Sequence, residues 1–182
     1  MEGQETGERE RETMFEALCL RCENRWLVKA LRQCQEGGGT ELDASNIVDR
    51  TGFVPTVVEA LALFPNLLKL HLSSKVMFME SLGDDGATAV AQALHLVPGL
   101  EELDLSHNKI TATGASSLAQ ALTSVPNLKK LDLTLNSFGD EGVTAVAQAL
   151  HLVPKLEEIG LNNREITATG ASSLAQALTS VP

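Results

Sequence analysis

Residues 100–127 read LEELDLSHNKITATGASSLAQALTSVPN, and this stretch decides the fold. Its first part alternates apolar and polar residues, so we expect Leu103 and Leu105 to face inward from a short, half-buried strand. Its second part places Leu118 and Leu122 beside small alanines at helical spacing, and Pro126 prevents that helix from continuing. One strand and one helix cannot bury their own apolar faces, so such units must stack with their strands parallel.

The stretch recurs along the chain with a period of 28 residues. The segment ITATGASSLAQALTSVP occupies 110–126 and, letter for letter, 166–182, while TAVAQALHLVP occupies 88–98 and 144–154. A fixed period of this length is typical of a solenoid. The interval from Leu70 to Leu103 is longer and places an insertion at 74–82. We therefore divide the chain into five units, at 39–66, 67–99, 100–127, 128–155 and 156–182.

The pattern L-x-x-L-x-L-x-x-N-x-I-x-x-x-G-x-x-x-L-x-x-x-L at this period resembles the leucine-rich repeat of the ribonuclease-inhibitor-like subtype. That subtype also occurs in the Ran GTPase-activating protein and in the sensor regions of nucleotide-binding immune receptors. The motif is degraded in the first two units, and Arg164 replaces the expected Asn in the fifth. The resemblance implies an α/β fold, namely a leucine-rich-repeat solenoid forming a horseshoe segment with a parallel concave sheet and convex helices. It also implies an intracellular protein.

The segment before the repeats is expected to cap the solenoid. We expect residues 1–12 to be a disordered acidic tail and residues 13–38 to form a helical N-terminal cap that covers the first repeat. Phe15, Leu18, Cys22 and Trp26 fall on one face of that helix, which the glycines at 37–39 end.

Two other interpretations of the cap remain open. Cys19, Cys22 and Cys34 could ligate zinc, although no fourth ligand is evident. The segment from Ala17 to Trp26 resembles the short box by which some ubiquitin-ligase substrate receptors bind elongin C, although its last position there is normally aliphatic.

The last repeat ends at Pro182 without a polar capping segment, so we expect the apolar edge of the fifth unit to be exposed. The chain is then either a fragment of a longer repeat protein, or it self-associates through that uncapped C-terminal repeat.

Composition narrows the class of partner. The net charge of −10 disfavours nucleic acid and membrane surfaces and favours a basic protein, and the 3% aromatic content argues against base stacking. The polar N-terminal stretch is no signal peptide, and three cysteines confined to 19–34 do not suit a disulfide-stapled secreted scaffold. We expect a cytoplasmic location, with the nucleus as an alternative.

The outward positions of the strands form the candidate binding surface on the concave face. They are Glu41, Asp43, Lys69, His71, Glu102, Asp104, Lys130, Asp132 and Glu158. Six carboxylates against two ammonium groups leave a net charge of −4 with His neutral. This face is either a docking strip for a basic partner or a solvated face that keeps the array soluble, and it lacks the Trp, Tyr and Arg anchors of tight interfaces. In the insertion, Met77, Phe78 and Met79 either pack on the core or contact a partner.

The sequence contains little that would support a catalytic function. The histidines are scattered, no nucleophile has an evident base, and neither a phosphate loop nor metal-ligand spacing is present, so we expect no cofactor and no metal. The sequence predicts an intracellular, non-enzymatic protein-recognition or scaffold module. The alternatives are a GTPase regulator resembling the Ran activator and a ubiquitin-ligase substrate receptor.

Overall fold

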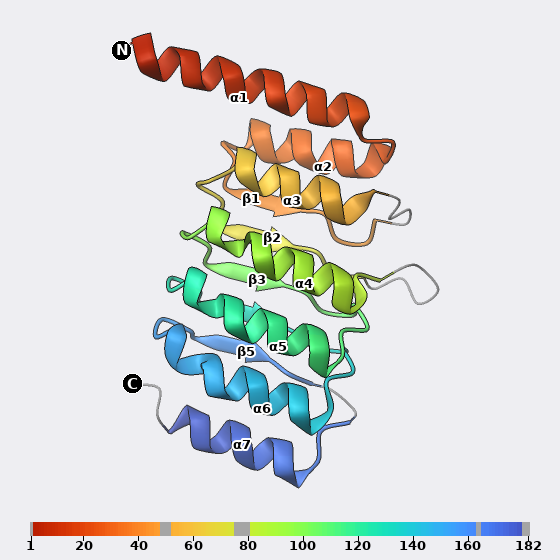
Figure 1. Cartoon of the computed structure of the whole chain (residues 1–182), viewed down its shortest axis with the longest axis vertical. Helices are drawn as coiled ribbons and strands as arrows, with labels where there is room; N and C mark the ends of the chain where they lie inside the picture. Colours follow the sequence, from red (N-terminus) through yellow and green to blue (C-terminus); the bar gives the residue numbers. More distant parts are fainter. Residues whose placement is uncertain (1, 48–51, 75–80, 163–164, 180–182) are drawn as a thin grey trace.

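The computed structural model describes residues 2–47, 52–74, 81–162 and 165–179, with side chains from Gly7 onward. Within these ranges, helices cover one side of a parallel sheet whose strands follow one another in sequence order (Figure 1). The strands are β1 (Glu41–Asp43), β2 (Lys69–His71), β3 (Glu102–Asp104), β4 (Lys130–Asp132) and β5 (Glu158–Gly160). The α-helices are α1 (Glu2–Arg21), α2 (Arg25–Glu36), α3 (Phe53–Leu63), α4 (Gly83–Ala93), α5 (Ala112–Ala121), α6 (Gly139–Ala149) and α7 (Ala168–Leu178). Short 3-10 turns, η1 (Leu94–Leu96), η2 (Leu122–Ser124) and η3 (Leu150–Leu152), extend α4, α5 and α6.

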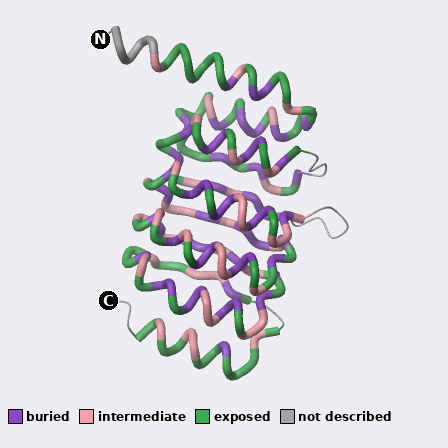
Figure 2. Tube along the Cα trace, viewed as in Figure 1, coloured by how far each residue is buried: buried purple, intermediate pink, exposed green. Residues whose placement is uncertain are grey.

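The core lies between the sheet and the helices, as the alternation of leucines predicts. Leu103 and Leu105 are at most 1% exposed, and Leu118 and Leu122 on the facing helical segment are at most 3% exposed. Each unit therefore contributes one strand and one helix to a core that runs the length of the molecule (Figure 2). The predicted solenoid of parallel strands is confirmed.

Buried asparagines join neighbouring units behind the strands. Nδ2 of Asn108 donates to the carbonyl of Leu72, and Oδ1 accepts from the backbone N–H of Leu82 at 3.2 Å. One unit later, Oδ1 of Asn136 accepts from the backbone N–H groups of Asn108 and Ile110, both at 3.0 Å. These asparagine side chains thus satisfy backbone groups that lie between a strand and the following helix.

An aspartate in α4 and another in α6 link each of these helices to the start of the next one. The carboxylate of Asp84 accepts hydrogen bonds from the backbone and hydroxyl of Thr111, the N-cap of α5, and from the N–H of Gly114. A Cβ at Gly114 would lie 2.7 Å from the Asp84 carboxylate, so glycine is required for this approach. Asp140 makes the same contacts with Thr167 and Gly170, as the duplication implies.

We expect Asp84→Asn to destabilise the chain by about 1 kcal/mol at neutral pH, since charge-assisted hydrogen bonds to an N-cap are lost. Burial raises the pKa of Asp84, but the hydrogen bonds from Thr111 and Gly114 outweigh it, and the pKa lies below its ordinary value. A lowered folded pKa stabilises the chain above the unfolded pKa, and this contribution disappears as pH falls through the folded value. Urea unfolding should therefore separate wild type from the variant at pH 7, and the difference should shrink as the pH falls below the unfolded aspartate pKa of about 3.9. A difference that persists unchanged in acid would contradict this role of the carboxylate.

The cap is built differently from the expected single helix over 13–38. It consists of the second half of α1 and the whole of α2, separated at Asn24, whose side chain accepts from the backbone N–H groups of Trp26 and Leu27 and so begins a new helix. Residues 2–12, expected to be disordered, form the first turns of α1. The Glu and Arg residues of this segment are strong helix formers, and α1 continues outward from the turns that Phe15 and Leu18 anchor in the core.

The duplicated segment has two different environments at its two positions. Leu122 is 1% exposed because α6 covers α5, whereas the equivalent Leu178 on α7 is 50% exposed. On α7 the buried position is Gly170 alone among the described residues. The outer edge of the fifth unit is thus exposed in the part of the chain that the structure describes.

Candidate protein-binding surface

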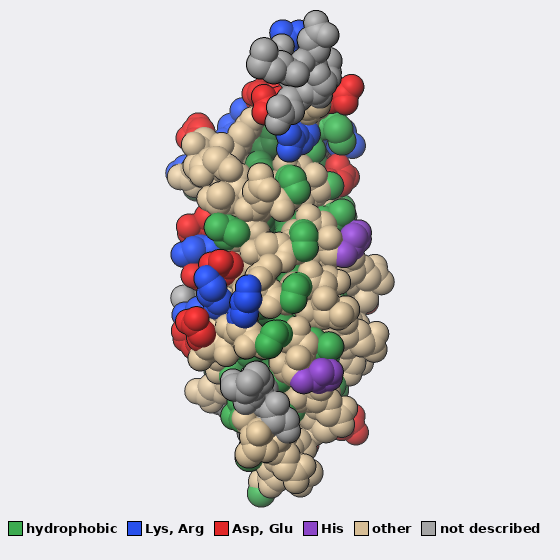
Figure 3. All heavy atoms as spheres, turned by 90° about the vertical axis from the view of Figure 1, so that its left-hand side faces the viewer, with side chains coloured by type: hydrophobic (Ala, Val, Ile, Leu, Met, Phe, Trp, Pro, Cys, Tyr) green, Lys and Arg blue, Asp and Glu red, His purple; other side chains and the backbone are tan. Residues whose placement is uncertain are grey.

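The sheet brings the predicted surface residues into register. The outer surface of β1 to β5, which we call the sheet face, carries the two columns at Glu41, Lys69, Glu102, Lys130 and Glu158, and at Asp43, His71, Asp104, Asp132 and Gly160. Basic and acidic side chains gather on this side of the molecule, and the histidines visible in Figure 3 lie on the helix side. The structure therefore places all nine predicted residues on one surface; their role in binding stays a prediction.

The first column is largely neutralised by ion pairs between neighbouring strands. Nζ of Lys69 lies 3.1 Å from Glu102, and Nζ of Lys130 lies 3.0 Å from Glu158. Glu102 also approaches Nε2 of His71 at 3.6 Å. Partial burial raises the pKa of Glu102, but Lys69 and His71 outweigh it, so the pKa lies below its ordinary value and Glu102 is charged at neutral pH.

The second column keeps its negative charge. Asp104 and Asp132 are directly opposite each other on β3 and β4. Each carboxylate accepts a local hydrogen bond, from the N–H of Ser106 and of Thr134, both at 2.9 Å. Within the described ranges neither has an ion-pair partner. Two like charges side by side, held in fixed orientation by their own backbone, form a preorganised site for a cation.

A tryptophan at the N-terminal end of the sheet face is a residue that sequence reasoning placed wrongly. Trp26 was expected on the inner face of the cap with Phe15 and Leu18, but it is 51% exposed on α2. The break at Asn24 rotates it out of that face. It lines a hollow of about 280 Å³ together with Asp43 and Ser45 at the end of β1. The surface therefore has an aromatic anchor of the type common in interfaces.

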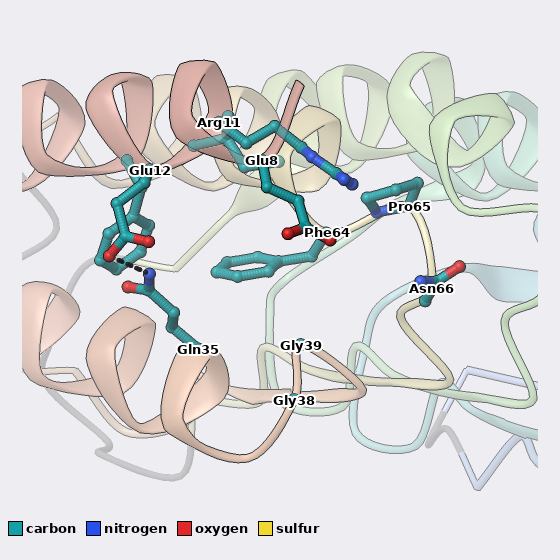
Figure 4. A pocket seen from close by; sticks show the side chains of 11 residues that line it. Glu8, Arg11, Glu12, Gln35, Gly38, Gly39, Phe64, Pro65 and Asn66 are labelled. Carbon is teal, nitrogen blue, oxygen red and sulfur yellow. Dashed lines mark hydrogen bonds between the residues drawn. The ribbon is translucent and has the colours of Figure 1, made fainter. Parts of the chain in front are cut away.

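A second hollow, of about 390 Å³, lies between α1 and the ends of α2 and α3 (Figure 4). The ring of Phe64 lies at its floor, and Glu8, Arg11 and Glu12 of α1 lie at its rim. Glu12 accepts a hydrogen bond from Gln35 at 3.4 Å across it. This hollow lies at the junction between the cap and the first repeat, and we interpret it as a feature of their packing and not as a binding site.

Two of the three cysteines, Cys19 and Cys34, are poor nucleophiles because they are buried. All three are free thiols, and Cys19 and Cys34 are buried. Burial raises the pKa of both, to about 11 for Cys34, so these thiols stay protonated at neutral pH. No group of three or more potential metal ligands occurs among the described residues, and none of the helices described there could span a membrane.

The helix break also bears on the elongin C alternative. Leu18 is 3% exposed in the core, and Trp26 lies on the next helix. The segment that resembles the box therefore does not form one exposed helical face. The insertion residues Met77, Phe78 and Met79, and Arg164, lie outside the residues that the structure describes.

Comparisons with known proteins agree with this architecture. Residues 100–119 and 126–147 match the family described as Leucine Rich repeat. The structure is similar to leiomodin-1 actin-binding site 2, with a TM-score of 0.63 and 19% identity over 84% of this chain and 87% of that one. It is also similar to the tropomodulin C-terminal domain of Caenorhabditis elegans, with a TM-score of 0.64 and 14% identity over 84% and 91% of the two chains. No curated protein sequence matches significantly. The chain thus has the leucine-rich-repeat solenoid fold.

Proposed function

We propose that this leucine-rich-repeat solenoid is a non-enzymatic module that binds a basic protein on its sheet face. The observation that carries the proposal is the unneutralised pair of carboxylates at Asp104 and Asp132, opposite each other in the centre of the sheet. A solvated face would need no such pair, because like charges on neighbouring strands destabilise a sheet. A partner with closely spaced Lys or Arg side chains would remove this repulsion on binding.

The similar structures support the coarser part of the proposal. Leiomodin-1 carries an actin-binding site on this fold, which shows that the architecture serves protein binding there. For this chain, the 28-residue period supports the ribonuclease-inhibitor-like subtype, and the acidic composition and free thiols support a cytoplasmic location. Self-association through the exposed α7 remains a prediction.

Partner capture with charge-neutral variants tests the proposal. The double variant Asp104→Asn/Asp132→Asn removes both charges while keeping the oxygens that accept from Ser106 and Thr134. We expect it to lose, by tenfold or more, the proteins that wild type retains, because each carboxylate would pair with a desolvated cation. The matched control is Asp85→Asn/Glu141→Gln, which makes the same change in charge on exposed positions of α4 and α6.

Equal retention by the two double variants would contradict binding on the sheet face. Actin is a defined probe for the same experiment, since a structure with this fold is named for an actin-binding site. A captured GTPase whose hydrolysis of GTP accelerates on binding would identify the module as a GTPase regulator.

A further inference from the structure

We propose that the groove between α2 and the outer edge of β1 binds an extended, basic peptide segment of the partner. The main chain of the segment would run along β1, with basic side chains at Glu41 and Asp43 and an apolar side chain against Trp26. This inference rests on the proposed function, because the groove opens onto the sheet face, and it names the part of the surface where recognition begins.

The groove consists of two adjoining hollows. The first, of about 280 Å³, lies below Trp26, and the second, of about 300 Å³, extends along the strand to Thr40 and Glu41. The two share Ala30 and Gln33 of α2 and Asp43 of β1, so they form one channel parallel to the strand. A channel of this length along a strand suits an extended chain better than a compact ligand.

The edge of β1 supplies main-chain partners. Thr40 accepts from the backbone of Lys69, the N–H of Ala44 donates to the carbonyl of His71 in β2, and the N–H of Asn46 donates to Ser73 just after β2. In a parallel sheet, alternate residues of a strand make the backbone hydrogen bonds to one neighbouring strand. Since Thr40 and Ala44 bond toward β2, the main-chain groups of Asp43 and the carbonyl of Glu41 face the outer edge of β1. β1 is the first strand of the sheet, and within the described ranges no strand pairs with its outer edge; α2 packs beside this edge, and the Glu41 backbone bonds there to Cys34. An added strand is an established way for peptides to use such an edge.

Charge selects a basic segment. Glu41 and Asp43 are exposed residues that line the groove, and within the described ranges neither has an ion-pair partner. Lys29 is the one cationic side chain among the groove residues, so the two carboxylates outnumber it. Across the strands, the same column continues from Asp43 through His71 to Asp104, so the acidic groove adjoins the acidic centre of the sheet face.

Trp26 supplies the apolar contact. The guanidinium of Arg25 lies 5.0 Å from its ring centroid, and Trp26 as a whole residue is 51% exposed. An indole that is held on one face and open on the other can contact a partner while losing little side-chain conformational entropy. Because it is the single tryptophan of the chain, its fluorescence reports on this groove alone.

Tryptophan fluorescence of the full chain tests the proposal. The probe is a short blocked peptide of alternating valine and lysine, and the control peptide alternates valine and glutamate. We expect the valine–lysine peptide, and not the control, to shift the Trp26 emission, with weaker binding at high salt. The double variant Glu41→Gln/Asp43→Asn should bind the peptide about tenfold more weakly, which corresponds to about 1.4 kcal/mol. Asp85→Asn/Glu141→Gln, which makes the same change in charge on the helical face, should change this affinity by less than about twofold, since additivity holds for separate sites.

Three results would overturn the proposal. They are an emission that does not respond to the valine–lysine peptide, an equal response to both peptides, and full affinity in the Glu41→Gln/Asp43→Asn variant. Calorimetry with Glu41→Gln/Asp43→Asn and with Asp104→Asn/Asp132→Asn separates a failure of the groove proposal from a failure of the proposed function. Binding that depends on Asp104 and Asp132 but leaves Trp26 unchanged would retain the sheet face and eliminate the groove. Far-ultraviolet circular dichroism verifies that each variant keeps the fold.

Discussion

Replacing Asn136 with alanine is expected to destabilise the chain by about 4 kcal/mol, the largest loss that we predict for one side chain. Oδ1 of Asn136 accepts from the backbone N–H groups of Asn108 and Ile110, and Nδ2 donates to the carbonyls of Leu105 and Leu133 at 3.0 and 2.9 Å. The side chain is 6% exposed, so the variant would leave several buried backbone groups without partners. Urea unfolding at neutral pH measures this loss.

The matched control is Asn66→Ala, at an exposed turn position. It should change the free energy of unfolding by less than about 0.5 kcal/mol, as surface substitutions usually do. Equal unfolding midpoints for Asn136→Ala and Asn66→Ala would contradict a role for the buried asparagines in joining the units.

The second large expected effect is a difference in stability between substitutions at two equivalent leucines, which lie in identical copies of the duplicated segment. Leu122→Ala should destabilise the chain by about 3 kcal/mol, because Leu122 is 1% exposed and its truncation leaves a cavity. Leu178→Ala should have an effect below about 1 kcal/mol, because Leu178 is 50% exposed. The flanking residues are identical in the two copies, so local helix propensity cannot produce the difference.

Unfolding of the two variants at low protein concentration measures the contrast. Similar losses at Leu122 and Leu178 would show that stacking of neighbouring units does not decide burial. If the effect of Leu178→Ala grows with protein concentration, another copy covers α7, as the expected self-association requires.

Much of the fold follows from the repeat itself. Because side chains alternate along a strand, the position of Leu103 fixes which of its neighbours face outward. The 28-residue period then aligns Glu102 with Lys130 and Asp104 with Asp132, as the strand register confirms. The insertion at 74–82 does not disturb this register, since it lies after β2 and the strands on each side still pair residue for residue.

The cap could not be predicted in the same way, since it occurs once and has no second copy to compare. Helical spacing alone continues through Asn24, and only the capping geometry at Trp26 and Leu27 shows that one helix ends and another begins. The same break turns Trp26 outward. Asn at position 24, followed by Arg and Trp, was the available signal, because Asn favours the N-cap position.

The central claim is that the sheet face, and not the helical face, contacts the partner. Carboxyl footprinting of the full chain with and without a captured partner tests it most directly, because the two faces carry carboxylates that label independently. We predict that the partner lowers the labelling of Asp104 and Asp132 on the sheet and leaves Asp85 and Glu141 on the helices unchanged. Protection of Asp85 and Glu141, with Asp104 and Asp132 still labelled as in the free chain, would contradict the account.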